Sequence, residues 1–305
     1  MQLLKKFIFT YVSIPYTIGY EVNDMKRNKH LIALDLDGTL LTTENKISAR
    51  TKQVILRAIE QGHVVVIATG RPHRASIQYY HELGLDTPMV NFNGALIHHP
   101  KNRNWGTLHQ PMSQQTALKI VDACYELSVH NMLAEVQDNV FLDKYDQQII
   151  DTFHSTSLKN PSFRIGSLRK ELMDDPTSLL IHPRDDHIHE LRSHLDDQHA
   201  ELIEHRTWGA PWNIIEIVRK GMNKAVGLKK IANHYNIPQE RIIAFGDEDN
   251  DLEMIDFAGV GVAMGNAIDE LKSIANYVTD TNVEDGIGMF LENYLQISVD
   301  HTDTA

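Results

Sequence analysis

The sequence contains a single cysteine, Cys124, among 305 residues. One thiol cannot close an intramolecular disulfide, which excludes the disulfide-framework folds of small secreted proteins. The residues around Cys124 do not provide the setting of a catalytic thiol, so we interpret it as a core residue on a helix face. These features indicate a protein of a reducing, cytoplasmic compartment.

No hydrophobic run has the length and continuity of a membrane span. An apolar and aromatic stretch at residues 7–20 is too short to cross a bilayer, and Pro15 interrupts it. The basic start at residues 1–6 resembles a signal-peptide n-region, but no small-residue cleavage site follows it before the charged run at 21–29. We interpret residues 1–28 as a dispensable N-terminal extension, with a membrane-associating anchor as the alternative. We expect no membrane partner.

Positive charge is in short supply, because 29 Lys and Arg face 41 Asp and Glu and the net charge is −12. Nucleic-acid-binding proteins need a basic face, so we expect no nucleic-acid partner. A small phosphorylated molecule is not excluded, since one metal cation, one lysine and a few backbone amides can hold a phosphate locally. The apolar fraction of 42% and the charged fraction of 23% are ordinary for a soluble globular protein.

Histidine is abundant, with 17 residues, but no HExxH pattern and no Cys/His ligand spacing accompanies it. We therefore interpret the histidines of the polar stretches as parts of a solvated face. They are His182, His187, His189, His194 and His199.

The first third of the chain alternates between buried strands and amphipathic helices. Apolar runs at residues 30–34, 64–68 and 88–92 predict strands of a parallel sheet, and Ser48 and Pro72 begin the helices between them. This order implies right-handed crossovers and a doubly wound α/β fold.

The pattern changes in the middle of the chain and then returns. Alternating segments separated by polar helices predict an inserted α+β domain at residues 97–208. Strand–helix alternation resumes at 214–218 and continues to 277–279. One core domain is therefore expected from two pieces of the chain, residues 29–96 and 209–297.

Two carboxylates follow the first expected strand, in the segment Asp35-Leu36-Asp37-Gly38-Thr39. Carboxylates this close repel each other unless a cation neutralises them. Oxygen ligands favour a hard cation, Mg²⁺ before Zn²⁺. In open α/β sheets, ligands bind beyond the carboxyl ends of the strands, so this segment is a candidate site.

Polar groups of two further segments suit a phosphate, although each signal is weak by itself. Thr69 and Gly70 follow the second strand, where a hydroxyl and a backbone amide at a helix start can bind phosphate oxygens. Lys224 lies on an early turn of a later helix, and an ammonium aimed at a carboxylate site could stabilise charge in a transition state.

A fourth segment, Gly246-Asp247-Glu248-Asp249-Asn250-Asp251, ends another strand in an acidic loop. The ligand spacing of an EF-hand calcium loop is absent. Asp247 can complete a metal site, Asn250 can donate to a phosphate oxygen, and Asp251 can hold the ligands from behind.

In this order the four segments resemble the motifs of the haloacid dehalogenase superfamily: DxDGT, a strand-terminal Thr, Lys, and GDxxND. The large insert, together with the segments 91–95, 223–225 and 282–286, is similar to the Cof-type, class IIB branch with a C2 cap. The resemblance covers about residues 29–295, and Ala225 stands where that branch is expected to have glycine.

The resemblance implies a role for each motif residue. Asp35 would be the nucleophile and a metal ligand, and Asp37 the general acid/base whose backbone carbonyl also reaches the metal. Asp247 would bind Mg²⁺, with Asp251 behind the ligands. The phosphoryl group would be held by the Leu36 amide, Thr69, Gly70, Lys224 and Asn250.

The implied activity is Mg²⁺-dependent hydrolysis of a small phosphorylated metabolite, a sugar phosphate or similar organophosphate, with flavin mononucleotide and pyridoxal phosphate left open. The insert would set specificity. A phosphomutase or phosphotransferase on the same core and a non-catalytic phospholigand-binding protein are the alternatives. A response-regulator receiver also forms phosphoaspartate beside Mg²⁺, but it is a compact single domain with its Asp mid-chain. The oligomeric state is not predicted.

Overall fold

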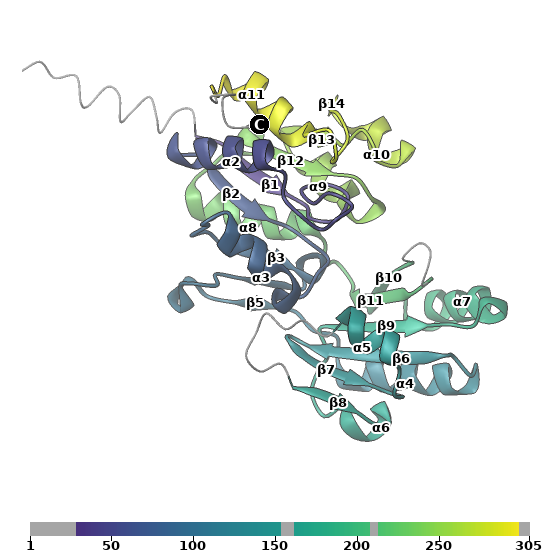
Figure 1. The fold of residues 1–305 in the computed structure, drawn as a ribbon. Helices are drawn as coiled ribbons and strands as arrows, with labels where there is room; N and C mark the ends of the chain where they lie inside the picture. The colour runs from purple at the N-terminus through teal and green to yellow at the C-terminus, as the bar shows by residue number, and fades with distance from the viewer. Residues whose placement is uncertain (1–28, 154–161, 208–212, 299–305) are drawn as a thin grey trace, which may run out of the picture.

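The computed structural model describes residues 29–153, 162–207 and 213–298 (Figure 1). Its core contains a five-stranded parallel sheet in the order β14-β13-β12-β1-β2. β1 lies between β2 and β12, so the strand that ends at Asp35 has one neighbour from each half of the chain. The strands are β1 (Leu31–Leu34), β2 (Val64–Ile67), β12 (Ile242–Gly246), β13 (Val260–Ala263) and β14 (Tyr277–Val278).

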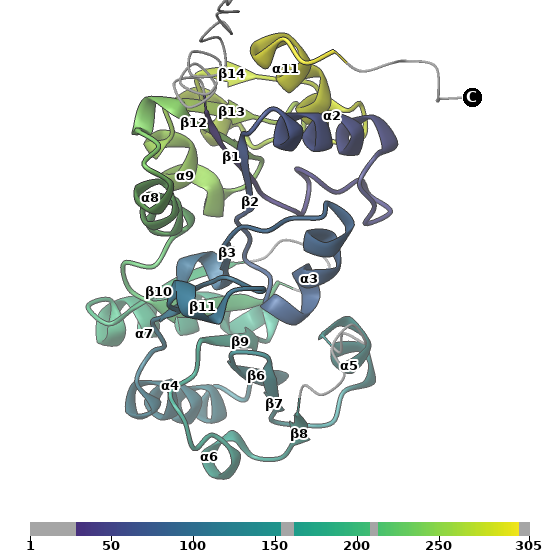
Figure 2. The ribbon, with the colours of Figure 1, turned by 90° about the vertical axis from the view of Figure 1, so that its left-hand side faces the viewer.

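The core sheet is covered on both faces, which explains why its inner strands are continuous apolar runs. Figure 2 shows α2 (Ala49–Glu60) and α11 (Gly286–Leu295) on one side, with α8 (Lys224–Tyr235) and α9 (Leu252–Phe257) on the other. α10 (Asp269–Ile274) lies next to α9. The expected helix cap at Ser48 is confirmed, because its hydroxyl accepts from the Thr51 amide at 3.1 Å.

A small sheet continues the core beyond β2. It consists of β3 (Met89–Asn91), β4 (Leu96–His98) and β5 (Leu108–His109), and Val90 of β3 forms a parallel bridge with Ala68. α3 (His73–Glu82) connects β2 to β3. Short 3₁₀ turns at Phe92–Gly94 and Arg103–Trp105 shape the neighbouring loops.

The second unit, called the cap below, runs from α4 to β11 and is built on a six-stranded sheet in the order β10-β11-β9-β6-β7-β8. Its pairs are antiparallel except β7 with β8. One face packs on α4 (Gln114–Glu126), α6 (Leu168–Glu171) and α7 (Ile188–His199), while α5 (Gln147–Phe153) lies on the other. The strands are β6 (Asn131–Val136), β7 (Asn139–Leu142), β8 (Phe163–Ile165), β9 (Ser178–His182), β10 (Ile203–Thr207) and β11 (Ile215–Arg219).

The doubly wound core with an α+β cap is confirmed, but the strand at residues 214–218 was assigned to the wrong sheet. β11 pairs with β9 and β10, so it completes the cap sheet and does not reopen the core. Its apolar run fits a buried strand of either sheet, and only the antiparallel pairing with β10 decides between them. The expected boundary at 208/209 therefore falls inside the cap, between the paired strands β10 and β11, and the other expected domain boundaries remain predictions.

Two expectations about single residue types have different outcomes. Cys124 is fully buried on α4, and burial raises the pKa of its thiol to about 12, which confirms a core residue. Most of the named histidines are exposed or half-buried, but His199 is buried beside His194. No helix within the described ranges has the length and apolarity to cross a membrane. The extension at residues 1–28 lies outside the described part of the chain.

Candidate active site

A fully buried ammonium joins three of the four motifs. Lys224, the first residue of α8, donates to Asp35 Oδ1 at 2.6 Å and to Asp251 Oδ1 at 2.7 Å. Asp35 extends from β1 and Asp251 from the loop after β12, and these strands are neighbours, so their carboxyl ends meet. The lysine motif is therefore part of the strand-end site that the sequence predicted.

The carboxylates of this cluster exceed the positive charge near them. Burial raises the pKa of Asp35 well above its usual value, Lys224 opposes this shift, and Asp251 and Asp247 add to it. Burial also raises the pKa of Asp247 to about 7, although a hydrogen bond from Thr39 lowers it. For Lys224, burial acts to lower the pKa, but Asp251 and Asp35 raise it above its usual value. The cluster is thus short of cationic charge.

Asp247 lies against the first motif. Thr39 Oγ1 donates to its Oδ1 at 2.7 Å. Gly38 has a φ of +72°, and a Cβ built there would lie 2.1 Å from Asp247 Oδ2. The glycine of DxDGT is therefore required twice, for its backbone conformation and for the room that it leaves to Asp247.

The residues present fit a hard divalent cation. Oxygens of Asp35, Asp247 and Asp251 lie within 4.8 Å of one another, and all three side chains are buried. Carboxylate oxygens are the ligands that Mg²⁺ prefers. Both oxygens of Asp251 already accept other bonds, since Oδ2 receives the amides of Asp247 and Glu248 at 3.0 and 3.2 Å. Asp251 therefore suits the expected role of holding the metal ligands from behind.

Asp37 takes a position apart from the buried cluster. Its side chain is 59% exposed and forms a two-pronged ion pair with Arg71, whose Nε donates to Oδ2 at 2.7 Å and whose Nη2 donates to Oδ1. Although burial acts to lower the pKa of Arg71, Asp37 raises it above its usual value. The two carboxylates of the first motif thus have different partners.

Two of the phosphate-binding candidates, Thr69 and Asn250, lie around Gly70. A Cβ on Gly70 would lie 3.2 Å from the side-chain amide of Asn93 and 3.5 Å from Asn250 Nδ2. Asn250 Nδ2 donates to Asn93 Oδ1 at 3.1 Å, and the Asn93 backbone donates to the Thr69 carbonyl at 3.2 Å. Thr69 is buried, and its hydroxyl accepts from the Arg71 amide. Leu36 is buried beside Asp35 in the first motif.

Several residues that the fold brings to the site had no role predicted from the sequence. Asn266, just beyond β13, donates to the Gly38 carbonyl at 2.8 Å. Asn93 lies within the segment 91–95 and Arg71 directly follows Gly70, but neither had an expected partner. The signal for Asn266 was its place after a core strand, the same signal that identified Asp35 and Asp247.

Several polar contacts join the cap to the core around the site. At the centre, Asn93 Nδ2 donates to the buried Glu216 of β11 at 3.2 Å. On one flank, Arg74 of α3 pairs with Glu135 of β6. On the other, Arg206 of β10 pairs with Glu253 of α9 at 3.0 Å.

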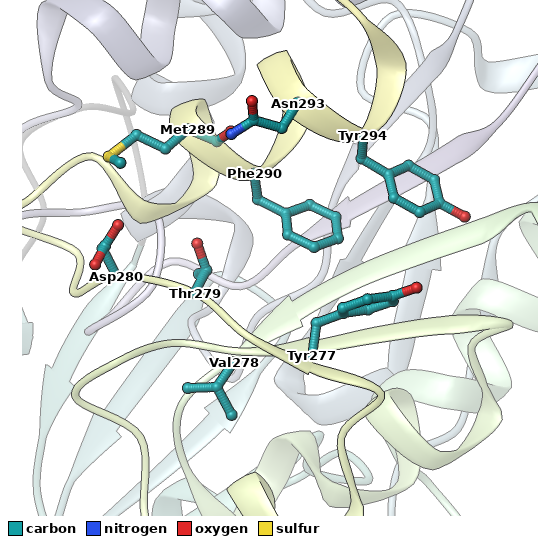
Figure 3. A pocket seen from close by; sticks show the side chains of 8 residues that line it. All are labelled: Tyr277, Val278, Thr279, Asp280, Met289, Phe290, Asn293 and Tyr294. Atoms are coloured by element: carbon teal, nitrogen blue, oxygen red, sulfur yellow. The ribbon is translucent and has the colours of Figure 1, made fainter.

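A separate cavity of about 480 Å³ lies between β14 and α11, at the edge of the core sheet. Figure 3 shows the rings of Tyr277, Phe290 and Tyr294 gathered in it. Its lining contains the carboxylate of Asp280 and no lysine, arginine or histidine, so it does not suit a phosphate.

Comparisons with known proteins agree with this geometry. The family model of haloacid dehalogenase-like hydrolases matches residues 32–291. The chain is 50% identical to 5-amino-6-(5-phospho-D-ribitylamino)uracil phosphatase YitU of Bacillus subtilis (strain 168), over 90% of this chain and 100% of YitU. It is 31% identical to pyridoxal phosphate phosphatase YbhA of Escherichia coli (strain K12), over 87% of this chain and 98% of YbhA. Among solved structures, the subclass IIB sugar phosphatase BT4131 superposes with a TM-score of 0.74 at 23% identity, covering 88% of this chain and all of the other.

Proposed function

The chain belongs to the haloacid dehalogenase-like hydrolases, and we propose that it hydrolyses a small phosphate monoester through a covalent phosphoaspartate on Asp35. The observation that carries this proposal is the buried cluster of Asp35, Asp247 and Asp251 against Lys224. A carboxylate can attack a phosphate dianion only where positive charge offsets the repulsion between them.

Asp35 attacks phosphorus, and the ester oxygen departs with the electrons of the P–O bond. Asp37 gives that oxygen a proton, so the product leaves as an alcohol. Asp37, now a carboxylate, takes a proton from water, and the hydroxyl oxygen attacks the phosphorus of the acyl-phosphate. Inorganic phosphate departs and Asp35 is regenerated, so atoms and charge balance over the two steps.

The other residues of the site hold the phosphoryl group. Lys224 fixes Asp35 and adds positive charge beside the transferred group. Thr69, Gly70, the Leu36 amide and Asn250 provide donors for the phosphoryl oxygens. Asp35, Asp247 and the Asp37 carbonyl would hold Mg²⁺, with Asp251 behind them, and the ion supplies charge that offsets the phosphate dianion.

Arg71 fixes the side chain of Asp37, the proposed acid/base. The guanidinium binds both oxygens of Asp37, whereas Asp35 is bound by Lys224. A fixed acid is needed most when the leaving group is an alkoxide, which departs poorly without a proton. An acid at Asp37 would therefore help most with phosphate esters of ordinary alcohols.

We propose 5-amino-6-(5-phospho-D-ribitylamino)uracil, the substrate in the name of the 50% identical relative, as the first substrate to test. It is an ester of a primary alcohol, which agrees with the assigned role of Asp37. Pyridoxal phosphate, the substrate in the name of the second relative, is the natural comparison.

The test is phosphate release by the purified full-length protein from a panel of metabolites with Mg²⁺ present. The panel holds the ribitylaminouracil phosphate, pyridoxal phosphate, flavin mononucleotide and several sugar phosphates, and Asp35→Asn is the inactive control. We expect the ribitylaminouracil ester to give the highest kcat/KM. Phosphorylated product in place of inorganic phosphate would favour the transferase alternative, and tight binding without turnover would favour the phospholigand-binding protein.

A further inference from the structure

The turn of the β6–β7 hairpin of the cap docks on the first turn of α3. Arg74 Nη2 donates to Glu135 Oε1, and the two side chains are 1% and 3% exposed. The other oxygen of Glu135 accepts from Ser178 Oγ of β9 at 2.8 Å. The pair is therefore buried at the junction of cap and core, with the cap carboxylate held from both sides.

A second cap carboxylate binds the same turn of α3. Asp138 Oδ1 accepts from the Arg74 backbone amide at 2.8 Å. The first amides of a helix have no acceptor within the helix, and the N-cap residue of α3, Pro72, makes no side-chain capping bond. A carboxylate also complements the positive end of the helix dipole. The cap thus supplies the capping group that the local sequence lacks.

The turn that the cap holds also holds Arg71. Arg71 Nη1 donates to the Ala75 carbonyl at 3.4 Å, while its Nε and Nη2 grip Asp37. A continuous set of contacts therefore runs from the cap hairpin through Arg74 and the first turn of α3 to Arg71 and the acid of the reaction. Figures 1 and 2 show α3 on the side of the core that faces the cap.

The physical character of the Arg74–Glu135 pair suits a device that sets geometry. Desolvation of a buried ion pair offsets most of its attraction, so such a pair adds little net stability. Removing one partner is costly, because the other charge stays buried without compensation. The pair therefore favours one position of the cap relative to the core.

We propose that Arg74 is a positioning residue: Glu135 and Asp138 of the cap clamp the first turn of α3 through it, and the clamped turn keeps Arg71 on Asp37. This inference rests on the proposed role of Asp37. It makes proton delivery to the leaving group depend on the seating of the cap, while attack by Asp35 does not use this route.

The dependence of the rate on the leaving group distinguishes proton delivery by Asp37 from attack by Asp35. An aryl phosphate such as p-nitrophenyl phosphate departs with little need of a proton, whereas an alkyl phosphate needs one. The first variant is Glu135→Gln, which keeps the side-chain shape and the bond from Ser178 but removes the charge. The matched control is Glu253→Gln, which removes the same charge from the cap–core pair with Arg206 and does not touch α3.

For Glu135→Gln we expect the ratio of alkyl to aryl kcat/KM to fall by about tenfold, a fraction of the hundredfold or more that general acid catalysis contributes. The ratio for Glu253→Gln should stay at the wild-type value. If Glu135→Gln lowers both esters by the same factor, the pair is structural only and the proposal is wrong. A wild-type protein that hydrolyses neither ester would overturn the proposed function itself, and this inference with it.

A second variant covers the case in which Glu135→Gln folds poorly. Arg74→Met with Glu135→Leu replaces the ion pair by apolar side chains, an exchange that is often neutral for stability. We expect this double variant to melt near the wild-type temperature and still to show the lowered alkyl-to-aryl ratio. A wild-type ratio in this well-folded variant would overturn the proposal.

Discussion

Lys224 Nζ lies 2.6 Å from Asp35 Oδ1, although 189 residues separate the two in sequence. The whole cap lies between them in the chain. Lys224 is fully buried and Asp35 nearly so, and the pair is shared with Asp251. The ammonium thus fixes the nucleophile and balances part of the charge around it.

Lys224→Ala should weaken transition-state stabilisation, calculated from kcat/KM, by about 2–4 kcal/mol, the scale of losing one preorganised electrostatic contact. The matched control is Lys220→Ala, because Lys220 Nζ donates to the Ala200 carbonyl of the cap and is exposed. Steady-state kinetics with one substrate would compare them, and circular dichroism would verify the fold. An equal effect of the two substitutions would contradict the assignment of Lys224.

Chelation should abolish activity, and added Mg²⁺ should raise the melting temperature. The reason is that Asp35 and Asp247 are buried among other carboxylates, and burial first, then these neighbours, raise the pKa of both. Binding to the folded state alone stabilises it by mass action. Phosphate release and differential scanning fluorimetry, with and without EDTA, provide the measurements. Full activity in excess EDTA would remove the metal from the mechanism, and Asp247→Asn should lose the thermal shift.

The two aspartates of the first motif should differ in covalent labelling by an aryl phosphate. Asp35→Asn has no nucleophile and should carry no phosphate. Asp37→Asn should still accept phosphate from a good leaving group, but should release it slowly, because the water is not activated. Mass spectrometry after an acid quench reads the label directly. Label on Asp37, or any label in Asp35→Asn, would reverse the assignment.

Gly38→Ala should impair metal binding more than an ordinary strained glycine substitution does. An alanine at positive φ costs roughly 1–2 kcal/mol in backbone strain, and here its Cβ would also displace Asp247. Gly62→Ala is the control, since Gly62 has a φ of +89° and open space around its Cβ position. Both should lose melting temperature, but Gly38→Ala alone should need more Mg²⁺ for half-maximal activity. If both variants need the same Mg²⁺ concentration for half-maximal activity, the site tolerates the methyl group.

Cys124 should resist thiol reagents in the folded protein. Burial raises the pKa of its thiol to about 12, so at pH 8 the reactive thiolate is scarce and the sulfur is covered. An aromatic disulfide reagent should label about one thiol only after denaturant is added, and activity should not depend on a reducing agent. Rapid labelling of the native protein would place Cys124 outside the core.

Some of the site could be predicted because it follows from the direction of the strands. Asp35 and Asp247 each follow a buried run, and parallel neighbours bring their ends together. Lys224 follows no such rule: its place on an early helical turn is a weak signal by itself, and the resemblance to a family strengthened it. The contacts of three other residues depend on turn geometry and on the position of the cap, which one sequence does not specify. These residues are Arg71, Asn93 and Glu216.

The misplaced strand at residues 214–218 has a similar cause. Alternate residues Ile215 and Ile217 pack on the cap helices, while Glu216 faces Asn93 of the core. The run still reads as fully buried, because its second face is covered as well: Ile214 packs in a cap cluster with Ile149 of α5, and Glu216 meets the core. A strand that is buried on both sides has the same local pattern in either sheet.

The order of the core strands has a consequence for synthesis of the protein. On the ribosome, Leu34 at the end of β1 emerges long before Ile242 at the start of β12, by roughly 10–40 s at about 5–20 residues per second. During that interval the edge of β1 that will pair with β12 is unpaired. All six strands of the cap sheet, by contrast, have been synthesised once the chain reaches Arg219. The cap can therefore fold first, and the nascent core, with the segment that carries Asp35, must stay open and free of aggregation until the ribosome delivers its other half.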